Sequence, residues 1–131
     1  MSRKLKFAMF LLFFMSSLYP GQGETLFDSI SAYLKRYRQD IYEKDLTVKN
    51  GVISLELDGR RTNHNSLLLL GFHSVGRQLQ KYSGTFREVQ IIIHYEMKNT
   101  QKIAVTASKE SVLALSQGRI NPEQFFNEVR Y

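Results

Sequence analysis

Apolar and polar residues change their spacing several times along the chain, and each change predicts a new element. Between Thr25 and about Glu43 the apolar residues recur every three or four positions, as on a helix with one apolar stripe. These residues are Leu26, Phe27, Ile30, Tyr33, Leu34, Tyr37 and Ile41. Thr25 and Asp28 suit a helix start, where a capping side chain and an acidic group are favourable. We therefore predict a helix over residues 25–43.

A strand pattern follows this helix and predicts a first hairpin. Leu46 and Val48 alternate with polar neighbours, and Asn50-Gly51 is a strong signal for a two-residue turn. Apolar and polar residues alternate again from Ile53 to Asp58. We predict two antiparallel strands, of which the first is short, followed by a polar connection over residues 59–65.

Residues 66 to about 82 again place apolar side chains at helical spacing. The run Leu67–Leu70 would also suit a short buried strand, because it is apolar and ends at a glycine. Gly71 and Gly76 each cost a helix about 1 kcal/mol relative to alanine. We favour a single helix in which the two glycines allow close packing against neighbouring elements.

A longer hairpin and two short helices complete the pattern. Arg87–Lys98 and Lys102–Ala107 have the alternation of strands, with Ile92 on the otherwise polar side of the first, and are separated by a turn. Ser108 starts a short helix that ends at Gly118, a residue suited to a left-handed helix cap. Asn121-Pro122-Glu123 starts the last helix, with a capping residue followed by proline at the first helical position.

The predicted order is α-β-β-α-β-β-α-α, which belongs to the α+β class. We expect a two-layer sandwich in which a four-stranded, mostly antiparallel sheet of two hairpins carries helices on one face. The alternation within the strands requires one apolar and one polar sheet face, as in a sheet covered on a single side. Residues 24–131 are expected to form one domain, without repeats or linkers.

The first 23 residues have the pattern of a secretory signal peptide. Three basic residues precede the apolar run Phe7–Met15, and the small residues Gly21 and Gly23 suit a signal peptidase. We place cleavage after Gly23. The apolar run is shorter than the roughly 20 residues of a membrane-spanning helix, and an uncleaved anchor over residues 7–18 is the alternative. The protein is accordingly expected to be exported in a bacterium, to the periplasm or beyond the cell.

Removal of the leader changes what the charge implies. The formal net charge of the 131-residue chain is +6, and residues 1–23 contribute three basic and no acidic side chains. The remaining chain carries about +3, which gives little reason to expect a nucleic-acid partner. The chain contains no cysteine, which excludes disulfides, zinc–thiolate sites and a thiol nucleophile. We predict no cofactor.

Two groups of residues deserve testing for catalytic chemistry. The segment Leu67–Gly76 places Ser74 near glycines, as in the nucleophile elbow of α/β-hydrolases, but Phe72 occupies the position of the first elbow glycine. His94 and Glu96 lie two apart on one strand, and could present two metal ligands on one face, with His64 as a third. No paired carboxylates and no phosphate-binding loop stand out.

Two surfaces are candidates for binding. The polar sheet face would present Glu88, Gln90, His94 and Glu96, and an open sheet face is a common docking surface. The basic residues Lys35, Arg36, Arg60 and Arg61 could form a patch for an anionic lipid or polysaccharide.

The segment Val48–Leu55, flanked by helices, resembles the strand pattern of periplasmic BON domains. This resemblance covers about a tenth of the chain. The second long hairpin and the two closing helices depart from that family, so we assign the chain to no family.

The favoured function is that of a small, exported, non-enzymatic domain that binds another envelope protein or an envelope component. One alternative is a small exported hydrolase or metal-dependent enzyme that uses Ser74 or His94 with Glu96. Another is an envelope component tethered by an uncleaved anchor, in which case the leader would contact the membrane.

Overall fold

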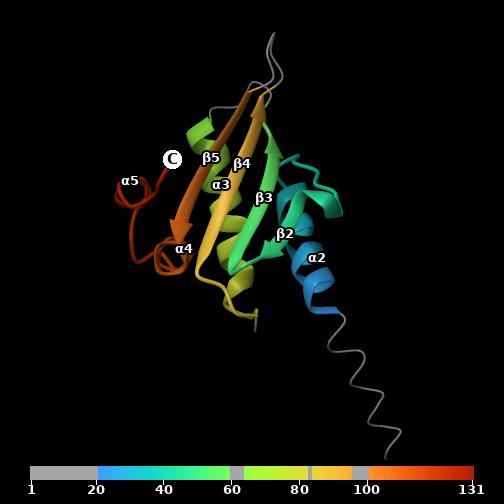
Figure 1. Ribbon diagram of the computed structural model, residues 1–131. Coiled ribbons are helices and arrows are strands. Elements are labelled where there is room, and N and C mark those ends of the chain that lie inside the picture. Colours follow the sequence, from blue (N-terminus) through green and yellow to red (C-terminus); the bar gives the residue numbers. More distant parts are fainter. Residues whose placement is uncertain (1–20, 60–63, 83, 96–100) are drawn as a thin grey trace, which may run out of the picture.

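The computed structural model describes residues 21–59, 64–82, 84–95 and 101–131 (Figure 1). Its elements in chain order are α2 (Gly21–Lys35), the 3-10 helix η1 (Glu43–Asp45), β2 (Leu46–Lys49), β3 (Val52–Asp58), α3 (His64–Leu79), β4 (Glu88–Tyr95), β5 (Gln101–Ser108), α4 (Lys109–Ser116) and α5 (Pro122–Phe126). This is the predicted order of helices and strands, with the short η1 added.

The four strands form one sheet in the order β2-β3-β4-β5. The pairs β2–β3 and β4–β5 are antiparallel hairpins, as predicted, whereas β3 and β4 pair in parallel. A parallel pair needs a crossover connection, which α3 supplies. Asn50 and Gly51 join the first hairpin with positive φ angles of 53° and 80°, as a type I′ turn requires. The mostly antiparallel four-stranded sheet is confirmed.

The helices lie on one face of the sheet, so the molecule has two layers (Figure 1). Alternate residues of the strands point into the layer between sheet and helices, where they are buried: Ile53, Leu55, Leu57, Val89, Ile91, Ile93, Val105 and Ala107. They pack against buried side chains of the helices, namely Ile30, Leu34, Leu68, Phe72, Val75, Val112 and Phe125. The predicted α+β sandwich with helices on one face is confirmed.

The first helix is shorter at its end than we predicted. It stops at Lys35, eight residues before Glu43, because Arg38 adopts a left-handed conformation with φ 62°. The Arg38 amide donates to the Lys35 carbonyl at 3.1 Å and the Gln39 amide to the Leu34 carbonyl at 3.1 Å, which is a Schellman cap. In the sequence, Ile41 lies at helical spacing from the preceding apolar residues. In the structure its side chain is buried in the core, but Ile41 belongs to the extended segment after this cap.

The start of the first helix also differs from the prediction, because α2 already begins at Gly21. Thr25 therefore lies within the helix and not at its start. The predicted leader, residues 1–23, falls almost entirely outside the described residues, and its cleavage stays a prediction.

The second helix is confirmed as a single helix, so Leu67–Leu70 is not a strand. Gly71 and Gly76 bring it close to its neighbours, as predicted. A β-carbon on Gly71 would lie 3.0 Å from Cγ2 of Ile91 on the sheet, and one on Gly76 would lie 2.9 Å from Cβ of Ser116 on α4.

The closing helices begin where the sequence predicts. Ser108 accepts a hydrogen bond from the Ser111 amide at 3.1 Å and caps α4. Asn121 and Gln124 form a reciprocal capping box at the start of α5, with N···O distances of 2.8 and 2.9 Å. The ring of Phe125 then packs edge-on against Phe72 of α3, with centroids 4.9 Å apart, and ties α5 to the core.

Candidate functional site

A row of polar side chains crosses the face of the sheet that the described helices leave open. Ser54 Oγ donates to Gln90 Oε1 at 3.3 Å, and Gln90 Nε2 donates to Thr106 Oγ1 at 3.4 Å. The strand register places these three residues on adjacent strands and on one face. The row fixes the Gln90 amide, so the middle of the open face is polar and already internally hydrogen-bonded.

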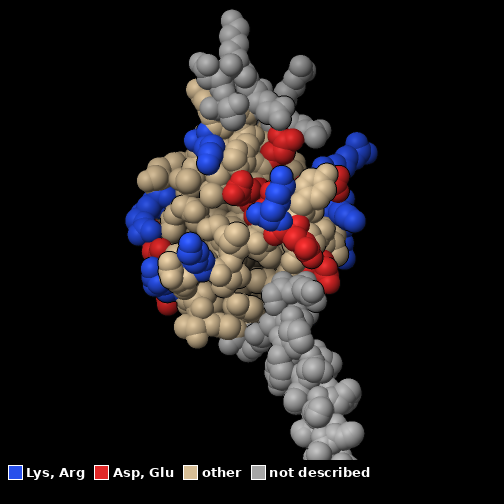
Figure 2. All heavy atoms as spheres, turned by 45° about the vertical axis from the view of Figure 1, so that its right-hand side comes forward, with Lys and Arg blue, Asp and Glu red and all other residues tan. Residues whose placement is uncertain are grey.

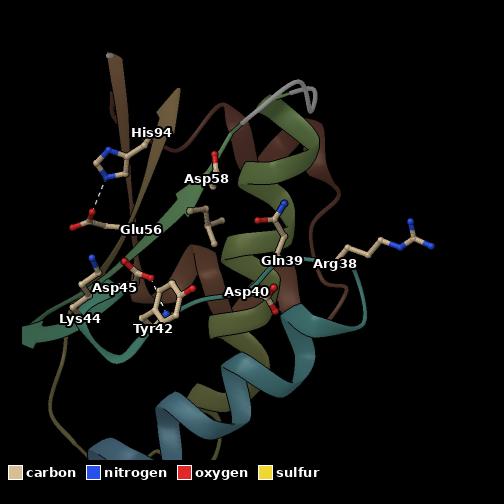
Figure 3. Close-up of a pocket in the computed structure, with 10 residues that line it drawn as sticks. Arg38, Gln39, Asp40, Tyr42, Lys44, Asp45, Glu56, Asp58 and His94 are labelled. Carbon is tan, nitrogen blue, oxygen red and sulfur yellow. Dashed lines mark hydrogen bonds and ion pairs between the residues drawn. The ribbon is translucent and has the colours of Figure 1, made fainter. Parts of the chain in front are cut away.

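The strand β2 is too short to cover the whole edge of β3. It pairs with Val52–Leu55 and does not extend along Glu56–Asp58. A hollow of about 520 Å³ lies there, which we call the acidic hollow (Figure 3). It is lined by residues 38–40, Tyr42, residues 44–45, residues 56–58 and His94.

The acidic hollow is rich in carboxylates. Four of its lining residues are acidic (Asp40, Asp45, Glu56 and Asp58) and two are basic, Arg38 and Lys44. Acidic side chains gather on this side of the molecule in Figure 2. The hollow is therefore suited electrostatically to a positively charged group rather than to an anion.

Two of these carboxylates are held by hydrogen bonds. His94 Nε2 lies 2.6 Å from Glu56 Oε1, and the two side chains are 32% and 40% exposed (Figure 3). Asp45 Oδ2 accepts from the Tyr42 amide at 2.8 Å and so fixes the start of η1. Because the Glu56–His94 pair is partly open to solvent, an incoming cation can approach Glu56 without first being stripped of all its water.

In the structure, the predicted sheet-face residues interact with different partners and do not form one cluster. Glu88, Gln90 and His94 point to the open face, as the alternation predicts. Glu88 accepts from Arg130 Nη2 at 2.9 Å, whereas His94 joins Glu56 in the acidic hollow. Glu96 lies outside the described residues. The pairing of Glu56 with His94 could not be predicted from the sequence, because nothing in the local pattern reveals that β3 and β4 run in parallel.

The basic patch can be followed only in part. Lys35 and Arg36 are exposed at the end of α2. Arg60 and Arg61 lie outside the described residues, so their position relative to α2 stays a prediction.

The enzymatic alternatives find little support in the geometry. Ser74 is 0% exposed in the middle of α3, and its Oγ donates to the Gly71 carbonyl at 2.8 Å. A nucleophile must reach its substrate, and this hydroxyl is enclosed. Among the described residues, no group of three or more His, Asp or Glu side chains could hold a metal ion. His64 is exposed at the start of α3, and the second predicted ligand, Glu96, is outside the described residues.

A second hollow, which the sequence did not predict, lies between α2 and α3. We call it the α2–α3 hollow; it has a volume of about 360 Å³. Its lining consists of Tyr33, Tyr37, Gln39, Ser66, Leu67, Leu69, Leu70 and His73. The helical spacing of Ser66, Leu69, Leu70 and His73 could be seen in the sequence, on one flank of the predicted helix. The sequence did not show that α2 would lie on the other side of the hollow.

Two titratable groups of this hollow are perturbed. Burial lowers the pKa of His73, and the nearby Arg77 charge lowers this pKa further. Burial also raises the pKa of Tyr33, with a hydrogen bond and charge repulsion from Tyr37 acting in the same direction. Perturbed groups in a concave site are typical of ligand-binding surfaces.

Comparison with protein-family models, curated proteins and solved structures gave no match to this chain. In the part of the chain that the structure describes, no helix is both long and apolar enough to cross a membrane. The function must therefore be argued from the two hollows and the open sheet face.

Proposed function

We propose that this protein is a small, exported, non-enzymatic domain, periplasmic or secreted, that binds another envelope protein through the open face of its sheet. The observation that carries the proposal is the acidic hollow at the uncovered end of β3, beside a sheet face on which no described helix packs. Its partner is expected to present a basic side chain.

The charge distribution supports a basic partner. The full chain has a formal charge of +6, or about +3 without residues 1–23, yet four carboxylates meet in one hollow. Such a local reversal of sign favours a lysine or arginine of a partner and repels an acidic surface. Arginine suits the site best, because its planar guanidinium can bind a carboxylate through two hydrogen bonds.

The neighbouring surface supports a protein partner rather than a small cation. Tyr42 lines the hollow and is 68% exposed, and large exposed aromatic side chains are enriched at protein interfaces. The mostly exposed strand β2 follows directly after the lining residue Asp45 and continues the surface along the sheet edge. A basic anchor in the hollow with flanking contacts to Tyr42 and β2 would form a small interface.

The proposal can be tested by site-specific photo-crosslinking in cells that make the protein. A photoreactive phenylalanine analogue replaces Tyr42, and in a matched control it replaces Tyr131, which is 76% exposed. We expect a crosslinked partner at position 42 only. Glu56→Gln should abolish this product, whereas Glu110→Gln, an exposed acid on α4, should leave it unchanged. Equal crosslinking at both positions, or indifference to Glu56→Gln, would contradict the proposal.

Export is tested separately, by mass spectrometry of the protein purified from fractionated cells. Cleavage after Gly23 predicts a mature chain that begins at Glu24 and is found outside the cytosol. A full-length chain held in the membrane fraction would favour the anchored alternative, and a full-length cytosolic chain would refute export.

A further inference from the structure

The α2–α3 hollow has the size and lining of a site for a small ligand. Its volume of about 360 Å³ lies within the range of roughly 300–1,000 Å³ that is usual for such sites. Leu69 and Leu70 are half-buried and offer an apolar wall, and the aromatic rings of Tyr33 and Tyr37 lie 5.4 Å apart on the opposite side. An aliphatic chain would gain free energy by covering these surfaces.

His73 lines the hollow, and one of its ring nitrogens has no hydrogen-bond partner. His73 Nδ1 is buried and makes no hydrogen bond within the protein. An unsatisfied buried polar atom costs roughly 1–3 kcal/mol. Because burial and the Arg77 charge disfavour its protonation, the imidazole is neutral near pH 7. Nδ1 is enclosed, so a ligand in the hollow would be met by the other ring nitrogen, Nε2, which can donate a hydrogen bond when it carries the proton.

Two positive charges lie close to residues that line the hollow. Arg77 Cζ lies 5.2 Å from the centroid of the Tyr33 ring, and Arg36 also acts electrostatically on Tyr33. No carboxylate is among the lining residues. No cationic side chain lines the hollow either, but the nearby Arg77 and Arg36 charges favour an anion there.

We propose that the α2–α3 hollow binds a free, single-chain amphiphile with a carboxylate head. The aliphatic chain lies along Leu69 and Leu70, and the head accepts hydrogen bonds from His73 and Arg77. This site is independent of the open sheet face, so it stands whether or not the protein binds a basic partner there.

Octanoate is the probe that tests the proposal on the purified full domain, by isothermal titration calorimetry. We expect saturable binding of one octanoate per chain, weaker binding of 1-octanol, and no binding of octylamine. In NMR spectra, octanoate should shift the imidazole resonances of His73 more than those of His64 and His94. Equal affinity for the three probes, or no saturable binding of octanoate, would overturn the proposal.

Substitution of Arg77 tests the contribution of its charge to binding separately from that of the apolar wall. Arg77→Met keeps a side chain over Tyr33 but removes the charge, so octanoate affinity should fall roughly tenfold, the value of one charge-assisted hydrogen bond. The binding of 1-octanol should not change. Lys81→Met removes an exposed charge just beyond the same helix and is the matched control. If both variants bind octanoate alike, the proposed anion contact is wrong.

A third variant fills the hollow. Leu69→Trp should remove the binding of octanoate and 1-octanol together, and its circular dichroism and melting temperature show whether it folds. Vesicles of phosphatidylglycerol test the other source of an anionic head. Binding to these vesicles without binding of octanoate would overturn the proposal, because the site would then be a membrane contact.

Discussion

Replacing Gly76 with alanine tests how closely α3 packs against α4, the contact that holds the closing helices on the core. The added β-carbon would lie 2.9 Å from Cβ of Ser116 and 3.1 Å from the carbonyl oxygen of Val112. Both atoms are fixed to the backbone of α4. They can move away only if α4 itself shifts, so the substitution strains the interface between the two helices.

The matched substitution Gly71→Ala meets different atoms. Its β-carbon would lie 3.0–3.1 Å from methyl carbons of Ile91 and Leu57, which are the far ends of side chains. Each alanine gains about 1 kcal/mol of helix propensity. Overpacking costs typically 1–3 kcal/mol where neighbours cannot move. We therefore expect Gly76→Ala to lower the free energy of unfolding by about 1 kcal/mol, and Gly71→Ala to change it by less than about 0.5 kcal/mol.

Urea unfolding followed by far-ultraviolet circular dichroism measures both variants under the same conditions. Equal slopes of the free energy against urea concentration would show that only the stability has changed. If Gly76→Ala is as stable as the wild type, or more stable than Gly71→Ala, then α4 is not held against α3 in the way described here.

Three further predictions concern the core, the cap and the pH dependence. Phe125→Ala should cost about 3–5 kcal/mol, because the ring is fully buried against Phe72, and thermal melting would detect it; a loss below about 1 kcal/mol would mean that α5 does not pack there. Arg38→Gly should stabilise the protein by about 0.5–1 kcal/mol in urea unfolding, by relieving a left-handed arginine, and destabilisation would contradict this. Because the pKa of His73 is lower in the folded than in the unfolded protein, protonation of His73 favours unfolding. The contribution of neutral His73 to stability is therefore complete above pH ~6.5 and is lost as the pH falls below that value. His73→Gln should flatten this loss between about pH 7 and 5, and an unchanged pH profile of the urea midpoint would refute it.

Local patterns in the sequence were sufficient for most of the elements. The alternation in Glu88–Tyr95 predicted both the strand and its buried face, and Asn50-Gly51 predicted the hairpin turn. The caps at Ser108 and Asn121 were also predicted, because each depends on hydrogen bonds between residues three apart. Signals of this range are complete within a short stretch of chain.

The candidate sites could not be predicted in the same way. Glu56 and His94 are 38 residues apart and meet only because β3 and β4 pair in parallel. The α2–α3 hollow needs two helices at a particular separation, which no periodicity encodes. The end of α2 was missed for a related reason, since Ile41 fits both a continued helix and a core contact from an extended segment.

Local sequence was enough to specify the order of the elements, the face that each strand buries, the turn at Asn50-Gly51 and the caps at Ser108 and Asn121. These properties depend on steric limits and hydrogen bonds between residues close in the chain. The tertiary structure alone decided the parallel pairing at the centre of the sheet, the acidic hollow at its uncovered edge and the orphan nitrogen of His73 between two helices. These features arise where distant segments meet, because burial and electrostatics act between all groups that come close in space, however far apart they lie in the chain.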